Sequence, residues 1–135
     1  MTRAIQVAVA ALAMLAAGSM HAPAVQLAQA VLVGEWAASL PCATSASRLR
    51  FAGNTLAFFS GAERNSEYEV EVSEAGDRVT VRIVNLIYDP TNRGLELGSA
   101  LEYRRAGEDL RFVGMALPGG GYMSPNIATL YQRCK

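Results

Sequence analysis

Apolar and polar residues alternate along most of the chain, with the period of a strand that has one buried face. The alternation is clearest over 67–73, where Tyr68, Val70 and Val72 are separated by glutamates. No segment after residue 30 sustains apolar residues at intervals of three and four, so the pattern predicts an all-β domain. About eight short strands are predicted, over 31–38, 48–51, 55–59, 67–73, 78–88, 101–104, 110–115 and 128–133.

The strand predicted over 78–88 changes phase part-way along its length. Val79, Val81 and Ile83 lie at odd positions, and the alternation then slips at Val84, so that Leu86 and Tyr88 lie at even positions. A β-bulge adds one residue to a strand and so exchanges its two faces. The pattern therefore predicts a bulge near Ile83 and Val84, with Leu86 and Tyr88 on the buried face.

Residues 1–30 have the pattern of a secretory signal peptide. Arg3 is the only charged residue in this stretch, and a nearly continuous apolar run follows over 5–17. The small-residue pattern Ala28-Gln29-Ala30 is typical of a signal-peptidase site, and the apolar run is shorter than the roughly 20 residues of a membrane-spanning helix. We expect cleavage before Val31, export to the periplasm or the extracellular space, and no integral membrane segment afterwards. One domain over 31–135 remains.

Charge and residue content then exclude several functions. The chain of 135 residues carries 12 basic and 12 acidic side chains, and removal of Arg3 leaves a net charge of minus one. This balance provides no basic surface for nucleic acid. His21, the one histidine of the sequence, lies in the predicted signal peptide. Histidine-dependent catalysis and histidine metal sites are therefore excluded, and no cofactor or metal is predicted.

Two cysteines, Cys42 and Cys134, lie near opposite ends of the predicted domain. In an oxidising compartment such a pair most simply forms one structural disulfide. The spacing lacks the Cys-x-x-Cys pattern of a redox pair. A bond between the two would also hold the first loop against the last strand, which favours closure of the sheet.

Eight short strands joined mostly by hairpins leave exposed edges unless the sheet closes on itself. The fold expected is therefore a small antiparallel up-and-down β-barrel. A two-sheet β-sandwich is the alternative, because it also buries one face of each strand and produces the same periodicity.

Gly34-Glu35-Trp36 on the first strand, with Arg133 on the last, resembles the lipocalin and calycin barrels. In that superfamily the tryptophan of a G-x-W motif covers the closed floor of the barrel, and an arginine from the last strand lies across it. A guanidinium over an indole is a favourable cation–π contact. The resemblance implies structural roles for Gly34, Trp36 and Arg133.

In length, strand count and single disulfide, the chain also resembles small exported bacterial barrels that inhibit lysozyme or secreted metalloproteases. Ser60-Gly61-Ala62 is similar to the loop that one family of lysozyme inhibitors inserts into the enzyme. The tyrosine expected shortly after that loop is replaced by Glu63-Arg64-Asn65, and the metalloprotease inhibitors place their disulfide near the N-terminus. The resemblance therefore implies the architecture and leaves the target open.

Two loops provide candidate contacts with a ligand or partner. The polar loop 89–94 presents Asp89 and Arg93, although a simple turn with Gly94 at positive φ explains the same residues. The glycine-rich segment 119–121 leads to Tyr122 and Met123, which form a candidate rim. Further candidates are the strand glutamates Glu67, Glu69 and Glu71, whose spacing suits a two-carboxylate glycosidase but whose strand face is predicted to be solvated.

These observations predict a non-enzymatic exported barrel. The function expected first is binding of a partner protein through the rim loops, for instance as an inhibitor of an envelope hydrolase such as a lysozyme or a protease. This hypothesis assumes that side chains fill the barrel, namely Trp36, Phe51, Tyr68, Phe112 and Tyr131. The alternative, a lipocalin-like carrier of a small apolar ligand, requires an apolar cavity of roughly 300 Å³ or more.

Overall fold

The computed structural model describes residues 32–135. The predicted signal peptide and its cleavage site lie outside these residues. Within the described part of the chain, no helix has the length and apolar character needed to cross a bilayer.

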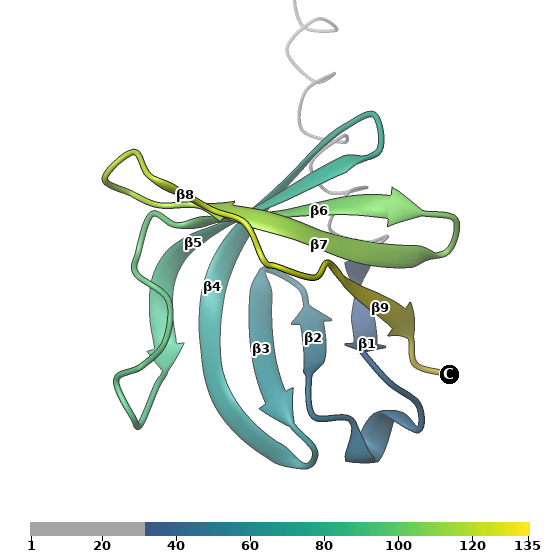
Figure 1. Ribbon diagram of the computed structural model, residues 1–135. Helices are drawn as coiled ribbons and strands as arrows, with labels where there is room; N and C mark the ends of the chain where they lie inside the picture. Colours follow the sequence, from purple (N-terminus) through teal and green to yellow (C-terminus); the bar gives the residue numbers. More distant parts are fainter. Residues whose placement is uncertain (1–31) are drawn as a thin grey trace, which may run out of the picture.

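Within residues 32–135, nine antiparallel strands and one short 3-10 helix make up the fold (Figure 1). Eight of the strands form a closed barrel, and the remaining one, β8, pairs with β7 alone. The 3-10 helix η1 spans Cys42–Thr44. The strands are β1 (Gly34–Ala37), β2 (Arg48–Ala52), β3 (Thr55–Ser60), β4 (Glu63–Ala75), β5 (Arg78–Tyr88), β6 (Ala100–Ala106), β7 (Asp109–Ala116), β8 (Tyr122–Met123) and β9 (Thr129–Arg133).

Pairing between the first and last strands decides between the two architectures expected from the sequence. Consecutive strands from β1 to β7 pair with one another, β7 pairs with β9, and β9 returns to β1. The ring of hydrogen bonds is therefore complete, and the barrel is confirmed in place of the sandwich. Closure removes the exposed strand edges that an open sheet of this size would present.

The predicted bulge in β5 is present. Val70 of β4 pairs with Ile83 while Glu69 pairs with Asn85, so Val84 is the extra residue. A second irregularity leaves Ile87 without an opposite residue on β4. The prediction that Leu86 and Tyr88 lie on the buried face is wrong. The Leu86 side chain is 51% exposed, and Tyr88 pairs with the outward-facing Glu67 and lies under the Arg64 guanidinium. β6 pairs with β5 only as far as Arg82, so beyond that residue β5 has a paired strand, β4, on one side alone.

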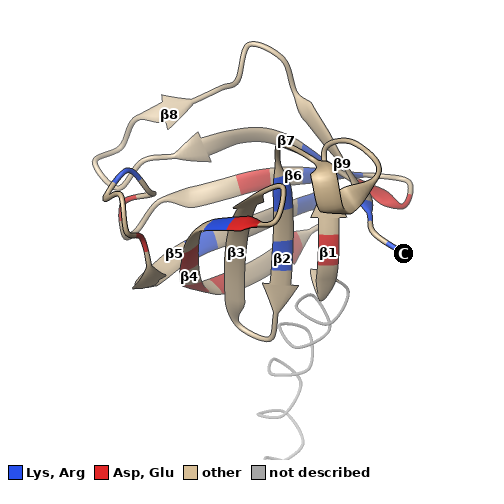
Figure 2. Ribbon diagram, turned by 90° about the horizontal axis from the view of Figure 1, so that it is seen from below, with Lys and Arg blue, Asp and Glu red and all other residues tan. Residues whose placement is uncertain are grey.

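The glutamates of β4 lie on the outer face of the barrel, as the alternation predicts, while Tyr68 between them is buried. Glu67 forms ion pairs with Arg64 at 2.9 Å and with Arg50 at 3.8 Å. Asn85 donates a hydrogen bond to Glu69. Figure 2 shows charged positions distributed over the barrel strands, whereas β8 and the connection from it to β9 have none.

One end of the barrel is closed by the tryptophan of the first strand. Trp36 is 1% exposed, and its Nε1 donates a hydrogen bond to the carbonyl of Leu32. The guanidinium of Arg133 lies 4.2 Å from the ring and donates to the carbonyl of Val33. Gly34 has a φ of 128°, and an added Cβ would lie 3.1 Å from Arg133 Nη1. This arrangement is consistent with the floor of a lipocalin-like barrel.

The predicted disulfide joins Cys42 to Cys134, with a Cα–Cα distance of 6.1 Å. It ties η1, in the connection between β1 and β2, to the residue that follows β9. The backbone N–H of Cys134 also donates to the carbonyl of Glu35 in β1. The covalent bond thus reinforces the junction between β1 and β9 at which the barrel closes.

Candidate functional site

The two ends of the barrel differ in their connections. Because successive strands run in opposite directions, their connections alternate between the ends. The end beside Trp36 carries tight hairpins, which turn at 53–54, 76–77 and 107–108. The opposite end, here called the open end, carries one tight turn and three longer connections, at 61–62, 38–47, 89–99 and 117–128.

A cavity of about 320 Å³ opens at this end of the barrel. Its walls come from strands distant in sequence: Phe58 of β3, Leu101 of β6 and Met115 of β7. The long connections complete it with Leu95 on one side and Pro125 on the other. The full lining is Phe58, Leu95, Leu101, Tyr103, Phe112, Met115, Met123, Ser124, Pro125 and Tyr131.

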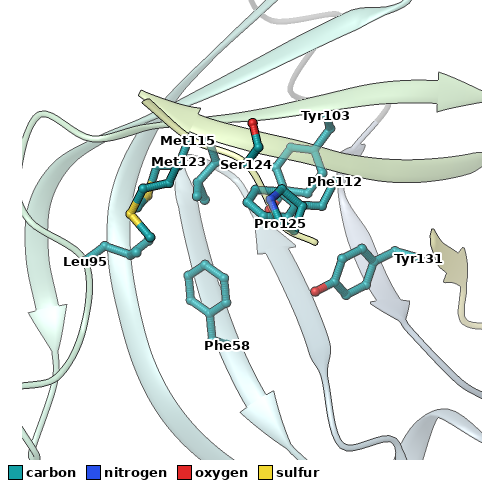
Figure 3. A pocket seen from close by; sticks show the side chains of 10 residues that line it. Phe58, Leu95, Tyr103, Phe112, Met115, Met123, Ser124, Pro125 and Tyr131 are labelled. Atoms are coloured by element: carbon teal, nitrogen blue, oxygen red, sulfur yellow. The ribbon is translucent and has the colours of Figure 1, made fainter. Parts of the chain in front are cut away.

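The lining is aromatic on one side and aliphatic on the other. In Figure 3 the Tyr103 and Phe112 rings lie together, Tyr131 lies nearby, and Met115, Met123 and Leu95 occupy the opposite side. None of the ten lining residues is an aspartate, glutamate, lysine, arginine or histidine. The polar groups of the lining side chains are the hydroxyls of Ser124, Tyr103 and Tyr131, and the last is hydrogen-bonded to Ser47 Oγ at 2.9 Å.

The expectation that aromatic side chains fill the barrel is wrong at the open end. Trp36, Phe51 and Tyr68 are buried in the core, as expected. Phe112 and Tyr131, however, line the cavity. The interior is therefore packed toward the Trp36 end and hollow toward the open end. The volume of the cavity lies at the lower end of the usual range for ligand pockets, roughly 300–1,000 Å³.

The loop 89–99 is held in place by two side chains. Asp89 accepts a hydrogen bond from the backbone N–H of Gly94, and the Tyr68 hydroxyl accepts one from that of Leu95. Asn92, and not Gly94, has the positive φ in this loop. Asp89 thus lies in the turn expected from the sequence. The structure brings neither Asp89 nor Arg93 to the cavity, and the residue of this loop that lines the cavity is Leu95.

Gly94 is expected to be required for its small size. A Cβ at this position would lie 1.9 Å from the Tyr68 hydroxyl and 2.7 Å from Asp89 Oδ2. We expect Gly94→Ala to lower the free energy of unfolding by about 1–3 kcal/mol, measured by urea denaturation, because the loop must move off Tyr68. Gly119→Ala is the matched control, since nothing lies within 4 Å of its added Cβ. Equal stability of the two variants would contradict the steric argument.

The two rim candidates of the glycine-rich segment point in different directions. Met123 lines the cavity. Tyr122 instead donates a hydrogen bond from its hydroxyl to Glu102 at 3.0 Å and lies over Gly114, where a Cβ would be 2.2 Å from its oxygen. Desolvation and the bond to Glu102 raise the pKa of the Tyr122 hydroxyl. Tyr122 thus links β8 to the outer face of β6, and Met123 alone of the four candidate contacts lies at the cavity.

Most of the lining was not identified from the sequence. The inward phase of the strands contains Phe58, Leu101, Tyr103 and Met115, but periodicity marks these residues only as buried. Ser124 and Pro125 lie in a segment without periodicity. The signal that the sequence does contain is the long uncharged stretch 117–128, which includes exposed apolar residues beside the glycines.

Within residues 32–135, no group of His, Cys, Asp or Glu side chains is placed to hold a metal ion. The glutamates considered for glycoside hydrolysis lie on the outer face of β4, away from the cavity lining. Comparison with protein-family models, curated proteins and solved structures finds no match. A functional proposal therefore rests on the geometry of the open end.

Proposed function

We propose that the protein is a non-enzymatic exported barrel that binds a small, neutral, apolar molecule in the cavity at its open end. The cavity itself carries this proposal, since it is concave, about 320 Å³ in volume and lined mainly by aromatic and thioether side chains. Burying apolar ligand surface there is favourable by roughly 25 cal/mol per Å² before the cost of association. The Cys42–Cys134 disulfide is compatible with an oxidising, extracytoplasmic location.

The absence of ionised groups from the lining favours an uncharged ligand. A carboxylate placed among these side chains would lose its hydration without gaining a cation, which is strongly unfavourable. Fatty acids and other anions would therefore have to keep their charged group outside the cavity. Neutral molecules with a compact apolar body avoid this cost.

The test uses N-phenyl-1-naphthylamine, a neutral apolar dye whose fluorescence rises when it leaves water. We expect a saturable increase in fluorescence on titration with the mature domain. Ser124→Trp should lower the affinity at least tenfold, because the indole would occupy the cavity. Asn126→Trp provides the matched control, since residue 126 is exposed in the same connection and does not line the cavity.

A lack of saturable binding would overturn the proposal. An equal loss of affinity in both tryptophan variants would also overturn it, because the dye would then be bound elsewhere on the rim. Circular dichroism of each variant checks that the barrel is intact.

Exposed apolar side chains around the open end favour a second candidate, binding of a partner protein. Ile127 is 84% exposed, and Leu86, Ile87 and Leu97 are each about half exposed. Clusters of exposed apolar residues often mark protein-binding surfaces. If the partner is an envelope hydrolase, the purified domain should inhibit a lysozyme or a secreted protease at stoichiometric amounts, and Ile127→Asp should abolish that inhibition. Full enzyme activity across such a panel would reject this candidate.

A further inference from the structure

Tyr103 differs from the other residues of the cavity in carrying a buried polar group without a partner. Its side chain lies on β6 and is only 2% exposed. Its ring packs at 5.4 Å from that of Phe112 and at 6.5 Å from that of Tyr131, measured between centroids. These contacts fix the position of the ring, and with it that of the hydroxyl.

No described residue forms a hydrogen bond with the Tyr103 hydroxyl, whereas the hydroxyl of Tyr131 is bonded to Ser47 Oγ. Among the described residues, the fully enclosed side-chain polar atoms without a partner are Arg48 Nε and Ser99 Oγ. Because the Tyr103 oxygen is not among them, it retains some accessible surface. Tyr103 lines the cavity, so this surface faces the cavity.

A buried hydroxyl without a partner is unfavourable, and native proteins normally satisfy such groups. Burial, with a smaller effect from the neighbouring Tyr131, raises the pKa of the Tyr103 hydroxyl far above its ordinary value. The hydroxyl therefore remains protonated under all physiological conditions and is available as a hydrogen-bond donor. A ligand with an acceptor oxygen at this position would complete the site.

The surrounding rings restrict the shape of such a ligand. Phe58 lies across the cavity from the Tyr103–Phe112 pair, and Met115 and Met123 bring thioether groups close to the same space (Figure 3). Aromatic rings and thioethers both make favourable contacts with a flat aromatic group. The lining thus combines surfaces for a ring with one directed hydroxyl donor.

We propose that the Tyr103 hydroxyl donates a hydrogen bond to a carbonyl, ether or hydroxyl oxygen of a neutral, ring-containing ligand, and so selects such molecules over pure hydrocarbons. This inference rests on the proposed function, because it names the ligand class of the same cavity. Since the site has no charged group, selectivity comes from this one directed bond within an otherwise apolar surface.

The experiment compares two molecules of nearly the same shape, 2-acetylnaphthalene and 2-isopropenylnaphthalene, which differ by C=O against C=CH2. Both are titrated by equilibrium dialysis against the mature domain. We expect the ketone to bind about five- to tenfold more tightly, as one hydrogen bond to a buried donor implies. The Tyr103→Phe variant should bind the ketone more weakly and the alkene with unchanged affinity, so that the two affinities become equal. Tyr131→Phe should retain the preference, because its hydroxyl is already bonded to Ser47.

The outcomes separate this inference from the proposed function. If both compounds bind wild type equally, or if Tyr103→Phe weakens both alike, the role of the hydroxyl is overturned while ligand binding stands. If Tyr131→Phe abolishes the preference and Tyr103→Phe does not, the donor is Tyr131 and the assignment is wrong. If neither compound binds, the proposed function fails and this inference fails with it.

Discussion

Trp36→Ala is expected to lower the free energy of unfolding by about 3–5 kcal/mol, the range for loss of a buried large aromatic side chain. The indole is 1% exposed and fills the closed end of the barrel. Its removal would also leave the Leu32 carbonyl without its donor and Arg133 without the ring at 4.2 Å. Urea denaturation followed by far-ultraviolet circular dichroism measures the change, since Trp36 is the one tryptophan of the chain.

Trp36→Phe is the control for this prediction. It retains an aromatic ring beneath Arg133 and loses the hydrogen bond to Leu32, so a smaller loss is expected. A Trp36→Ala variant within about 1 kcal/mol of wild type would contradict the structural role of the tryptophan. Because the cavity lining does not include Trp36, Trp36→Phe should bind the neutral dye as wild type does.

Removal of the disulfide by Cys42→Ala with Cys134→Ala should cost about 4–5 kcal/mol in the chain-entropy treatment. The bond closes a loop of 92 residues, so the unfolded chain without it gains much conformational freedom. The loss also acts where β9 meets β1, a junction with few paired residues. Urea denaturation of the double variant against wild type measures the effect.

Reduction provides an independent check on the disulfide. A reducing agent should destabilise the wild type to about the level of the double variant and should leave the double variant unchanged. A loss below about 1 kcal/mol would show that the unfolded chain is compact without the bond, so that the cross-link removes little freedom. Free-thiol counting on the purified, unreduced protein tests the bond itself, and two reactive thiols would contradict it.

Local alternation predicted the strands well because the barrel has one buried face throughout. The inward set of β4 and the bulge at Val84 follow directly from that period. The burial of Leu86 did not follow, although it pairs with the buried Tyr68, because β6 does not continue beside the end of β5. Inward orientation makes a residue buried only where other elements cover the same space.

The candidate site was harder to predict than the fold. Met123 and Tyr122 were both predicted as contacts from their place after the glycines. Met123 lines the cavity, whereas the Tyr122 hydroxyl donates a hydrogen bond to Glu102 on the outer face. Asp89 and Arg93 made the loop 89–94 a candidate from the sequence, yet the residue that the connection 89–99 contributes to the cavity is Leu95. Polar residues in loops stand out in a sequence, whereas an apolar lining looks the same as a packed core.

The sequence by itself determined the all-β class, the approximate strand positions and the two cysteines available for a cross-link, because these depend on local period and composition. Tertiary structure decided that the sheet closes into a barrel and that its open end is hollow. Whether inward side chains meet across the barrel depends on the distance between opposite strands, such as β3 and β7, which no local pattern specifies. The same distance leaves a cavity beside Tyr103.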